Sequence, residues 1–289
     1  MKRLLIVGCG DIALRALPQL VRNYQVFGLA RKAEQAGRVA ALGAKPVSGD
    51  LDDASTLQAL HAASDLVLHL APPGENGERD QRSLNLIATL SARPPERLVY
   101  ISTSGVYGDC GGAWVDEERP LAPQNLRAVR RVDAERSLLA WGKQSGVAVT
   151  VLRVPGIYAA ERLPLAHLKR GIPVMRAEDD VYTNHIHADD LASICATALA
   201  RGAAGRVYNA SDDGEIKMGD YFDLVADRAG LPRPARISRA AAEAGAISEG
   251  LMSFMRESRR LSNTRMKAEL GVRLRYPSVL EGVPAFVTT

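Results

Sequence analysis

The chain has 289 residues, few cysteines, few aromatic side chains and no long apolar run. Its three cysteines, Cys9, Cys110 and Cys195, are scattered without a CxxC spacing. This usage predicts a reducing, cytoplasmic setting and no structural metal site. No apolar run approaches the roughly 18 residues that a bilayer span requires. The first apolar run begins within a few residues of the start, so we expect neither a signal peptide nor a membrane segment.

Charge of one sign is also scarce. The 37 basic and 33 acidic residues leave a net charge of +4, and the arginines are spread along the chain. Basic patches interleaved with aromatic residues are missing, which argues against a nucleic-acid partner. A hydrophobic content of 46% and a charged content of 24% are ordinary for a soluble globular protein.

What the sequence does contain is a regular alternation of short apolar runs and helix-like segments. The runs are typical of buried parallel strands and lie at 4–7, 26–30, 44–47, 66–71, 97–102, 149–154 and 206–211. Because βαβ crossovers are right-handed, the pattern predicts an α/β fold with a Rossmann-type doubly wound parallel sheet. We expect a Rossmann domain over 1–160, to which 184–210 returns. Residues 161–183 and 211–289 would form a smaller C-terminal α/β substrate lobe.

The sequence GCGDIA joins the first predicted strand to the first predicted helix. Gly8 permits a tight turn, Gly10 lets a diphosphate approach the backbone, and Ala13 keeps the helix close to the sheet. The helix starts at Asp11 and Ile12, where free N–H groups favour an anion. The stretch therefore predicts a dinucleotide site, with a purely structural glycine turn as the alternative.

The end of the second strand bears on which dinucleotide binds. Arg31 and Lys32 stand where an NAD site usually has a carboxylate, and cations there attract a 2′-phosphate. This favours NADP, with NAD still possible and a solvated basic turn as the alternative. After the third strand, Asp50 and Leu51 would flank the adenine. The end of the fourth strand would line the middle of the cofactor with small apolar groups, namely Leu70, Ala71 and Pro72.

The fifth strand ends in STSGVYGD, which places hydroxyl groups at the sheet edge opposite a bound nicotinamide. Taken with GCGDIA, LRVPGIY and NHIHADDLA, in this order, it resembles the extended short-chain dehydrogenase/reductase superfamily of the NAD-dependent epimerase/dehydratase type. The resemblance covers nearly the whole chain. It implies oxidoreductase, epimerase or dehydratase activity on a carbonyl or nucleotide-sugar-like substrate. It also puts the catalytic hydroxyl at Thr103, with Ser104 beside it as a substrate contact.

One departure from that superfamily is important. Members carry YxxxK on the next helix, which here is predicted from an N-cap at Asn125 to Gly146. Aligning a family glutamate with Glu135 puts Arg131 at the lysine and Arg127 at the tyrosine, as in an atypical branch. Arg131 can keep the electrostatic role and bind the nicotinamide ribose. Arg127 cannot replace the phenol, because a guanidinium stays protonated above about pH 12. It would instead face a cofactor or substrate anion, unless Arg131 pairs with Glu135 and Arg127 is solvated.

Other residues could supply the missing proton. Tyr107, in VYG, is a candidate substitute acid, and Tyr158, in PGIY, faces the same cleft as a possible substrate contact. His185 and His187 lie two apart on a short strand and so point to opposite faces. We interpret them as structural and expect no metal site.

Two further questions stay open from the sequence. The chain could be a non-catalytic NADP(H)-binding sensor that acts through a protein partner, because the usual acid/base pair is missing. It could also form a homodimer through helices at 78–92 and 126–143. Residues that would face a partner, but could equally pack internally, are Leu84, Leu86, Ile87, Val129, Ser137 and Trp141.

Overall fold

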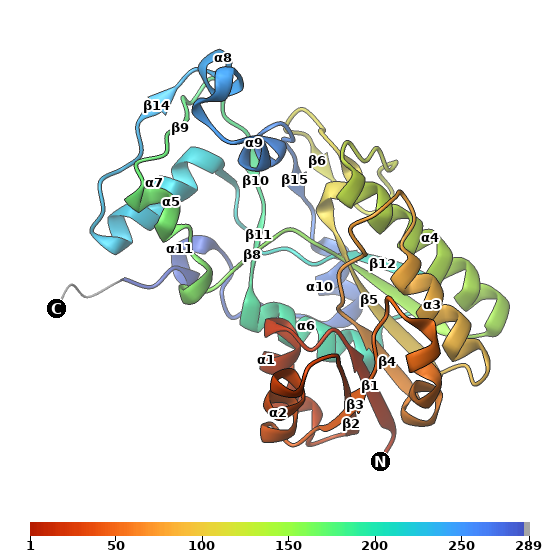
Figure 1. Cartoon of the computed structure of the whole chain (residues 1–289). Helices are drawn as coiled ribbons and strands as arrows, with labels where there is room; N and C mark the ends of the chain where they lie inside the picture. Colours follow the sequence, from red (N-terminus) through yellow and green to blue (C-terminus); the bar gives the residue numbers. More distant parts are fainter. Residues whose placement is uncertain (286–289) are drawn as a thin grey trace.

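The structure, a computed structural model, describes residues 1–285 except for the side chains of residues 61–63. Seven parallel strands form the central sheet in the order β3-β2-β1-β4-β5-β7-β12 (Figure 1). They are β1 (Arg3–Val7), β2 (Gln25–Ala30), β3 (Lys45–Ser48), β4 (Leu66–His69), β5 (Arg97–Thr103), β7 (Ala148–Val154) and β12 (Arg206–Asn209). Each predicted run contributes one strand, so the predicted doubly wound α/β fold is confirmed.

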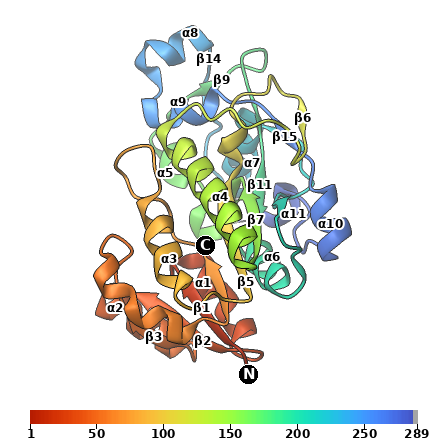
Figure 2. The same cartoon turned by 90° about the vertical axis from the view of Figure 1, so that its right-hand side faces the viewer.

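Helices cover both faces of this sheet (Figures 1 and 2). On one face lie α1 (Asp11–Leu20), α2 (Ala33–Ala41) and α6 (Ala188–Arg201), and on the other η1 (Ala54–Ala63), α3 (Gln81–Ser91) and α4 (Leu126–Ser145). Side chains along a strand alternate between these layers: Leu4 and Ile6 join one core, and Leu5 and Val7 the other. All four are fully buried. The strand order reverses between β1 and β4, where such sheets open a crevice at their carboxyl edge.

Helix α4 begins and ends as its sequence predicts. The Asn125 side chain caps the start by accepting from the Ala128 N–H at 3.0 Å. Gly146 ends the helix in the left-handed region, with φ of +75°. Both signals are local, which explains why the sequence is enough to place this helix.

The predicted dimer face is only partly exposed. Leu86 and Trp141 belong to the internal core between α3, α4 and the sheet, and the Trp141 indole donates to the Ser91 hydroxyl at 3.0 Å. Those two residues therefore pack internally, which was the alternative left open. The others are half-buried: Leu84, Ile87, Val129 and Ser137.

A smaller lobe lies over the edge where the strands end (Figure 1). Its short elements, with those that connect it to the sheet, are η2 (Ser104–Tyr107), β6 (Trp114–Val115), β8 (Gly156–Tyr158), η3 (Ala160–Arg162), α5 (Leu165–Lys169), β9 (Val174–Met175), β10 (Tyr182–Thr183), β11 (His185–His187), β13 (Ile216–Lys217), α7 (Met218–Ala229), β14 (Arg236–Ile237), α8 (Arg239–Ala241), η4 (Ala242–Ala246), α9 (Glu249–Met255), β15 (Arg260–Leu261), α10 (Thr264–Leu270) and α11 (Val279–Gly282). The lobe has its own apolar core around Phe222 and Met252.

Two segments cross the domain boundaries expected from the sequence. Tyr158, in the predicted Rossmann stretch, packs in the core of the lobe. Met266 and Leu270 of α10, in the predicted lobe, pack instead against the sheet beside α6. The sheet domain and the smaller lobe therefore each include side chains from the part of the sequence that was predicted to form the other.

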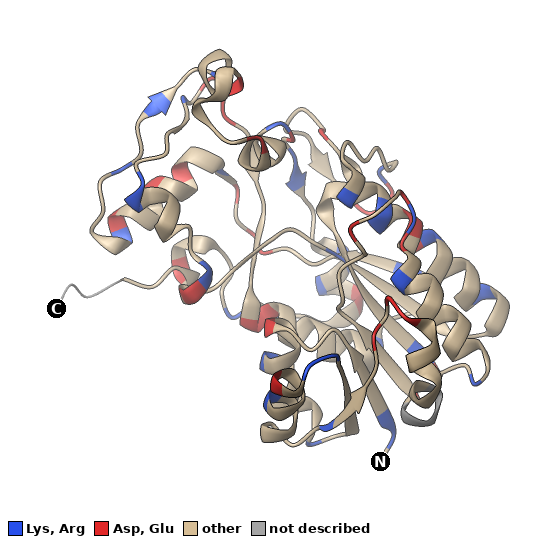
Figure 3. Ribbon diagram, viewed as in Figure 1, with Lys and Arg blue, Asp and Glu red and all other residues tan. Residues whose placement is uncertain are grey.

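Lys and Arg are interspersed with Asp and Glu over both the sheet region and the lobe (Figure 3). Within residues 1–285, none of the helices is both long enough and apolar enough to cross a membrane.

Candidate functional site

The turn between β1 and α1 has the geometry that a dinucleotide diphosphate needs. Gly8 has a φ of +95°, and a Cβ built there would lie 2.4 Å from the backbone nitrogen of Ala71. Only glycine fits that position. Gly10, the N-cap of α1, has a φ of −88°, and a Cβ built there has no atom within 4 Å. One glycine is thus required by the fold, and the other leaves open space at a helix start, where phosphate binds well.

A cavity of about 270 Å³ opens beside this turn at the carboxyl ends of β1 to β4. Eight of the residues predicted to bind a cofactor line it: Gly8, Gly10, Arg31, Asp50, Leu51, Leu70, Ala71 and Pro72. Five others do not: Asp11, Ile12, Ala13, Lys32 and Arg131. Ile12 and Ala13 are buried under the turn, where Ala13 packs in the core as predicted, whereas Lys32 is exposed at the start of α2.

Three lining residues were missed from the sequence: Leu29, Gln35 and Arg82. The Gln35 amide donates to the Cys9 carbonyl at 3.4 Å and accepts from the Arg31 N–H at 3.1 Å, so it links the turn to the end of β2. Arg82 comes from α3 and has no local sequence signal. Leu29 could have been found as the penultimate residue of β2.

Charge in this cavity is balanced rather than simply basic. Arg82 binds Asp52 through two nitrogens at 2.7 and 2.6 Å, which lowers the pKa of that carboxyl. One guanidinium nitrogen of Arg31 lies 3.7 Å from an oxygen of Asp50 and 3.7 Å from one of Asp52. A 2′-phosphate would therefore have to compete with two carboxylates for Arg31, with Lys32 nearby as a second cation.

Cys9, between the two glycines, packs in the core under the turn. Its thiol is buried and lies 3.6 Å from the Ile6 carbonyl. Burial raises its pKa to about 12, so the sulfur stays a thiol at neutral pH.

A second, larger cavity of about 460 Å³ lies between the end of β5, the start of α4 and the smaller lobe. We call it the substrate cleft. Four predicted residues line it: Thr103, Ser104, Arg127 and Tyr158. The Thr103 hydroxyl accepts from the Gly105 N–H at 3.2 Å, which holds the oxygen at the end of the strand. The sequence predicted a substrate lobe but did not identify the side chains through which it lines the cleft: Tyr182, His185, Tyr221, Phe222, Phe254 and Arg259.

Tyr158 and His185 form part of the wall of this cleft. The Tyr158 hydroxyl donates to the Ser278 carbonyl at 3.1 Å, and burial with nearby carboxylates such as Asp212 raises its pKa above the usual range. The His185 ring stacks on Tyr221 with 4.3 Å between centroids, and burial lowers its pKa to about 3. His185 is thus a neutral, packed ring, as expected, and His187 caps α6 by accepting from the Asp189 N–H at 3.2 Å.

The structure does not place Tyr107 in the cleft, contrary to its prediction as a substitute acid. Its side chain is buried, its hydroxyl donates to the Asn209 amide oxygen at 2.7 Å, and it accepts from Arg153 at 2.9 Å. Burial raises its pKa to about 12. The correction has a simple physical cause, because both hydrogen-bonding directions of the phenol are used inside the protein.

Arg131 also departs from the sequence-based interpretation, because it lines neither cavity. Its guanidinium donates to the Tyr100 hydroxyl at 3.0 Å and to the Ile101 carbonyl at 2.6 Å, which ties α4 to β5. The alternative pairing with Glu135 is wrong as well. Glu135 forms a buried ion pair with Arg153 of β7, with 2.8 Å between nitrogen and oxygen.

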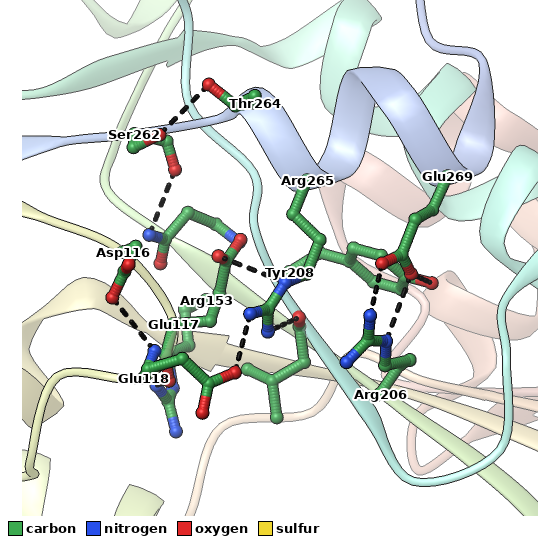
Figure 4. A network of polar contacts seen from close by, with 12 residues as sticks. Asp116, Glu117, Glu118, Arg153, Arg206, Tyr208, Ser262, Thr264, Arg265 and Glu269 are labelled. Atoms are coloured by element: carbon green, nitrogen blue, oxygen red, sulfur yellow. Dashed lines mark hydrogen bonds and ion pairs between the residues drawn. The ribbon is translucent and has the colours of Figure 1, made fainter.

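Arg153 of β7 and its neighbours form a polar network with the residues that follow β6 and with α10 (Figure 4). The Glu117 carboxylate accepts from the Asn209 N–H at 2.7 Å and lies 3.5 Å from Arg265 of α10, which donates to Glu118 at 2.5 Å. Among the described residues, no group of three or more His, Cys, Asp or Glu side chains could hold a metal ion.

The sequence matches one family model and is similar to several proteins of known name. Residues 9–211 match the model of the NAD dependent epimerase/dehydratase family. GDP-6-deoxy-D-mannose reductase from Pseudomonas aeruginosa is 32% identical over 55% of this chain and 59% of its own. dTDP-glucose 4,6-dehydratase from Mycobacterium tuberculosis is 29% identical over 64% of this chain and 66% of its own. The chain thus spans less than two thirds of the length of these curated relatives. A quinoline-oxide ketoreductase from Stigmatella aurantiaca is 26% identical over 85% of this chain and 80% of its own.

Solved structures share the fold over nearly the full length. A functionally unknown conserved protein from Silicibacter pomeroyi is 29% identical, with a TM-score of 0.81 over 98% of this chain and 96% of that one. UDP-glucose 4-epimerase from Thermotoga maritima has a TM-score of 0.79 at 18% identity, over 98% of this chain and 96% of its own. Because the family model matches well over half of the residues, the chain belongs to the NAD dependent epimerase/dehydratase family.

Proposed function

We propose that the protein is an NADP-dependent oxidoreductase or epimerase of this family that acts on a carbonyl or nucleotide-sugar-like substrate without the usual Tyr–Lys pair. The observation that carries the proposal is the pair of cavities along one sheet edge, one beside an open glycine turn and one at a strand-end hydroxyl. Bound NAD(P) would supply the hydride for a substrate in the second cavity.

The residues of the first cavity fit the dinucleotide. The diphosphate would lie against Gly10 and the start of α1, and Asp50 with Leu51 would flank the adenine. Arg31 and Lys32 would contact a 2′-phosphate, which is the basis for proposing NADP rather than NAD. Relatives of this fold include UDP-glucuronic acid 4-epimerase from Bacillus cereus in complex with NAD, at 18% identity.

In the cleft, the Thr103 hydroxyl would orient the substrate carbonyl by a hydrogen bond. Arg127 would bind an anionic group of the substrate, because a guanidinium cannot exchange protons at neutral pH. Tyr158 is held by the Ser278 carbonyl and would contact substrate rather than transfer a proton. We therefore assign proton exchange to water in the cleft.

A second function has its own supporting observation. In the alignment with the family motif, Arg127 takes the position of the phenol, and Tyr107, the candidate substitute acid, is buried outside the cleft. A non-catalytic NADP(H)-binding module that signals through a protein partner would show the same features.

Turnover assays separate the two functions. The protein is incubated with NADPH carrying deuterium at C4 and a panel of ketones and aldehydes, and in parallel with NADP or NAD and a panel of nucleotide sugars. Products are separated by chromatography and read by mass spectrometry. Deuterium in a reduced product, or an epimer or dehydration product of a sugar, supports the enzyme. Tight NADPH binding with neither outcome across a broad panel favours the binding module.

A further inference from the structure

Arg127 differs from every other arginine of the substrate cleft. Arg259 donates to Glu257 at 2.8 Å, and Arg162 donates to Asp11 of α1 at 3.0 Å. Arg127 has no carboxylate within ion-pair distance anywhere in residues 1–285. Its guanidinium instead lies over the Phe254 ring, 4.6 Å from the centroid. The cleft therefore contains one exposed cation whose charge no residue of the described chain neutralises.

The remaining charge of the cleft does not offset it. Glu257 is the carboxylate among the lining residues, and its side chain is 7% exposed. One of its oxygens accepts from Arg259, and the other accepts from the Asn125 amide at 3.3 Å. A ligand that enters the cleft meets a net positive field at Arg127, and this favours an anion.

Arg127 lines the same cleft as the strand-end hydroxyl of Thr103. A Cβ built on Gly105 would lie 3.6 Å from the Thr103 hydroxyl oxygen and 3.8 Å from the Ala128 Cβ, so these two side chains flank the same residue. Arg127 directly precedes Ala128 in the first turn of α4 and lines the same cavity as Thr103. The anion that Arg127 binds and the carbonyl that Thr103 orients would therefore belong to one ligand in this cleft.

We propose that Arg127 binds a carboxylate next to the reacting carbon, so that the substrates are 2-oxo acids or 2-hydroxy acids with an apolar or aromatic side chain. A single free guanidinium matches the one charge and planar shape of a carboxylate, whereas phosphate sites gather several donors. The rings of Phe254, Phe222 and Tyr221 in the same cleft provide the apolar surface for the side chain.

This inference rests on the proposed function for its chemistry. In the reducing direction, a hydride from NADPH adds to the carbonyl carbon and water gives a proton to the oxygen. A 2-oxo acid thus becomes a 2-hydroxy acid as NADPH becomes NADP. The carboxylate itself is unchanged and serves only to hold the substrate against Arg127 and Thr103.

The test uses benzoylformate and its methyl ester, which share the ring and the reacting carbonyl and differ in charge. Calorimetry measures the binding of each to the protein with and without saturating NADP. We expect wild-type protein to bind the acid at least about tenfold more tightly than the ester, as a charge-assisted pair of hydrogen bonds would give. Arg127→Gln should weaken binding of the acid to the level of the ester and leave the ester unchanged. Arg127→Lys should lie between the two.

A matched control is Arg136→Gln, which removes an exposed arginine from the same helix, away from the cleft lining, and should change neither affinity. The inference is overturned if wild type binds acid and ester equally, if it fails to bind the acid at millimolar concentration, or if Arg127→Gln keeps the acid affinity. NADP binding is measured in the same titrations. If NADP binds but the acid binds no more tightly than the ester, only this inference is refuted. If NADP does not bind, the proposed function is refuted.

Discussion

Replacing Gly10 with alanine should separate ligand binding from folding at the β1–α1 turn. The added methyl group meets no protein atom within 4 Å, and the φ of −88° is one that alanine adopts without strain. We therefore expect the free energy of unfolding to change by less than about 0.5 kcal/mol. The methyl group takes space that we assign to the diphosphate. Losing one charged hydrogen bond to the backbone would cost about 1.5–3 kcal/mol, or about 10- to 150-fold in affinity.

Two other glycines provide the comparison. Gly8→Ala places a methyl group 2.4 Å from the Ala71 nitrogen at a φ of +95°, so backbone strain and overpacking should together cost about 2–6 kcal/mol of stability. Gly37 is an exposed residue of α2, and the methyl group added by Gly37→Ala would have no atom within 4 Å. It should stabilise the helix by about 0.5–1 kcal/mol and leave cofactor affinity unchanged.

Calorimetric titration with NADP and NAD gives the affinities, and urea unfolding gives the stabilities. The reasoning is refuted if Gly10→Ala binds both dinucleotides as tightly as wild type. It is also refuted if Gly10→Ala is destabilised as strongly as Gly8→Ala, because the open space around Gly10 would then not exist.

Three further predictions follow from the described contacts. Replacing Arg31 and Lys32 with alanine should weaken NADP binding far more than NAD binding in the same titrations, and equal losses would remove the 2′-phosphate contact. Asp212 is buried, and burial with nearby carboxylates raises its pKa to about 8. Its protonated form is favoured in the folded state, so its contribution to stability is full below about pH 4 and lost as the pH rises to about 8. Asp212→Asn should therefore stabilise the protein more at pH 8 than at pH 5, by about 1.4 kcal/mol per pH unit at most, in urea unfolding. An equal effect at both pH values would contradict this assignment. Glu135→Gln leaves Arg153 buried without its partner and should cost about 3 kcal/mol of unfolding free energy. A loss below about 1 kcal/mol would show that water solvates the Arg153 guanidinium.

The sequence was sufficient where the signals are local. Alternating apolar runs identify all seven strands of the sheet, and the capping residues Asn125 and Gly146 identify the ends of α4. The glycine turn could be placed in the same way, because a tight turn, an open helix start and a close strand are features of a few consecutive residues.

The sequence was not sufficient where a side chain chooses among distant partners. Glu135 is one helical turn from Arg131, yet it pairs with Arg153 of β7 because that guanidinium is buried beside it. Tyr107 lies in a family motif, but its hydroxyl donates a hydrogen bond to Asn209 in the last strand of the sheet. Arg82 of α3 lines the cavity beside the β1–α1 turn and pairs there with Asp52, which is distant in the sequence. Such choices depend on tertiary packing that helical or strand periodicity does not report.

The central claim is that the β1–α1 turn binds a pyridine dinucleotide, and one calorimetric experiment tests it directly. Purified protein is titrated with NADP, NADPH, NAD and NADH. We expect saturable one-to-one binding of at least one of them, tighter for the phosphorylated pair. No heat of binding with any of the four at millimolar concentration would contradict the account.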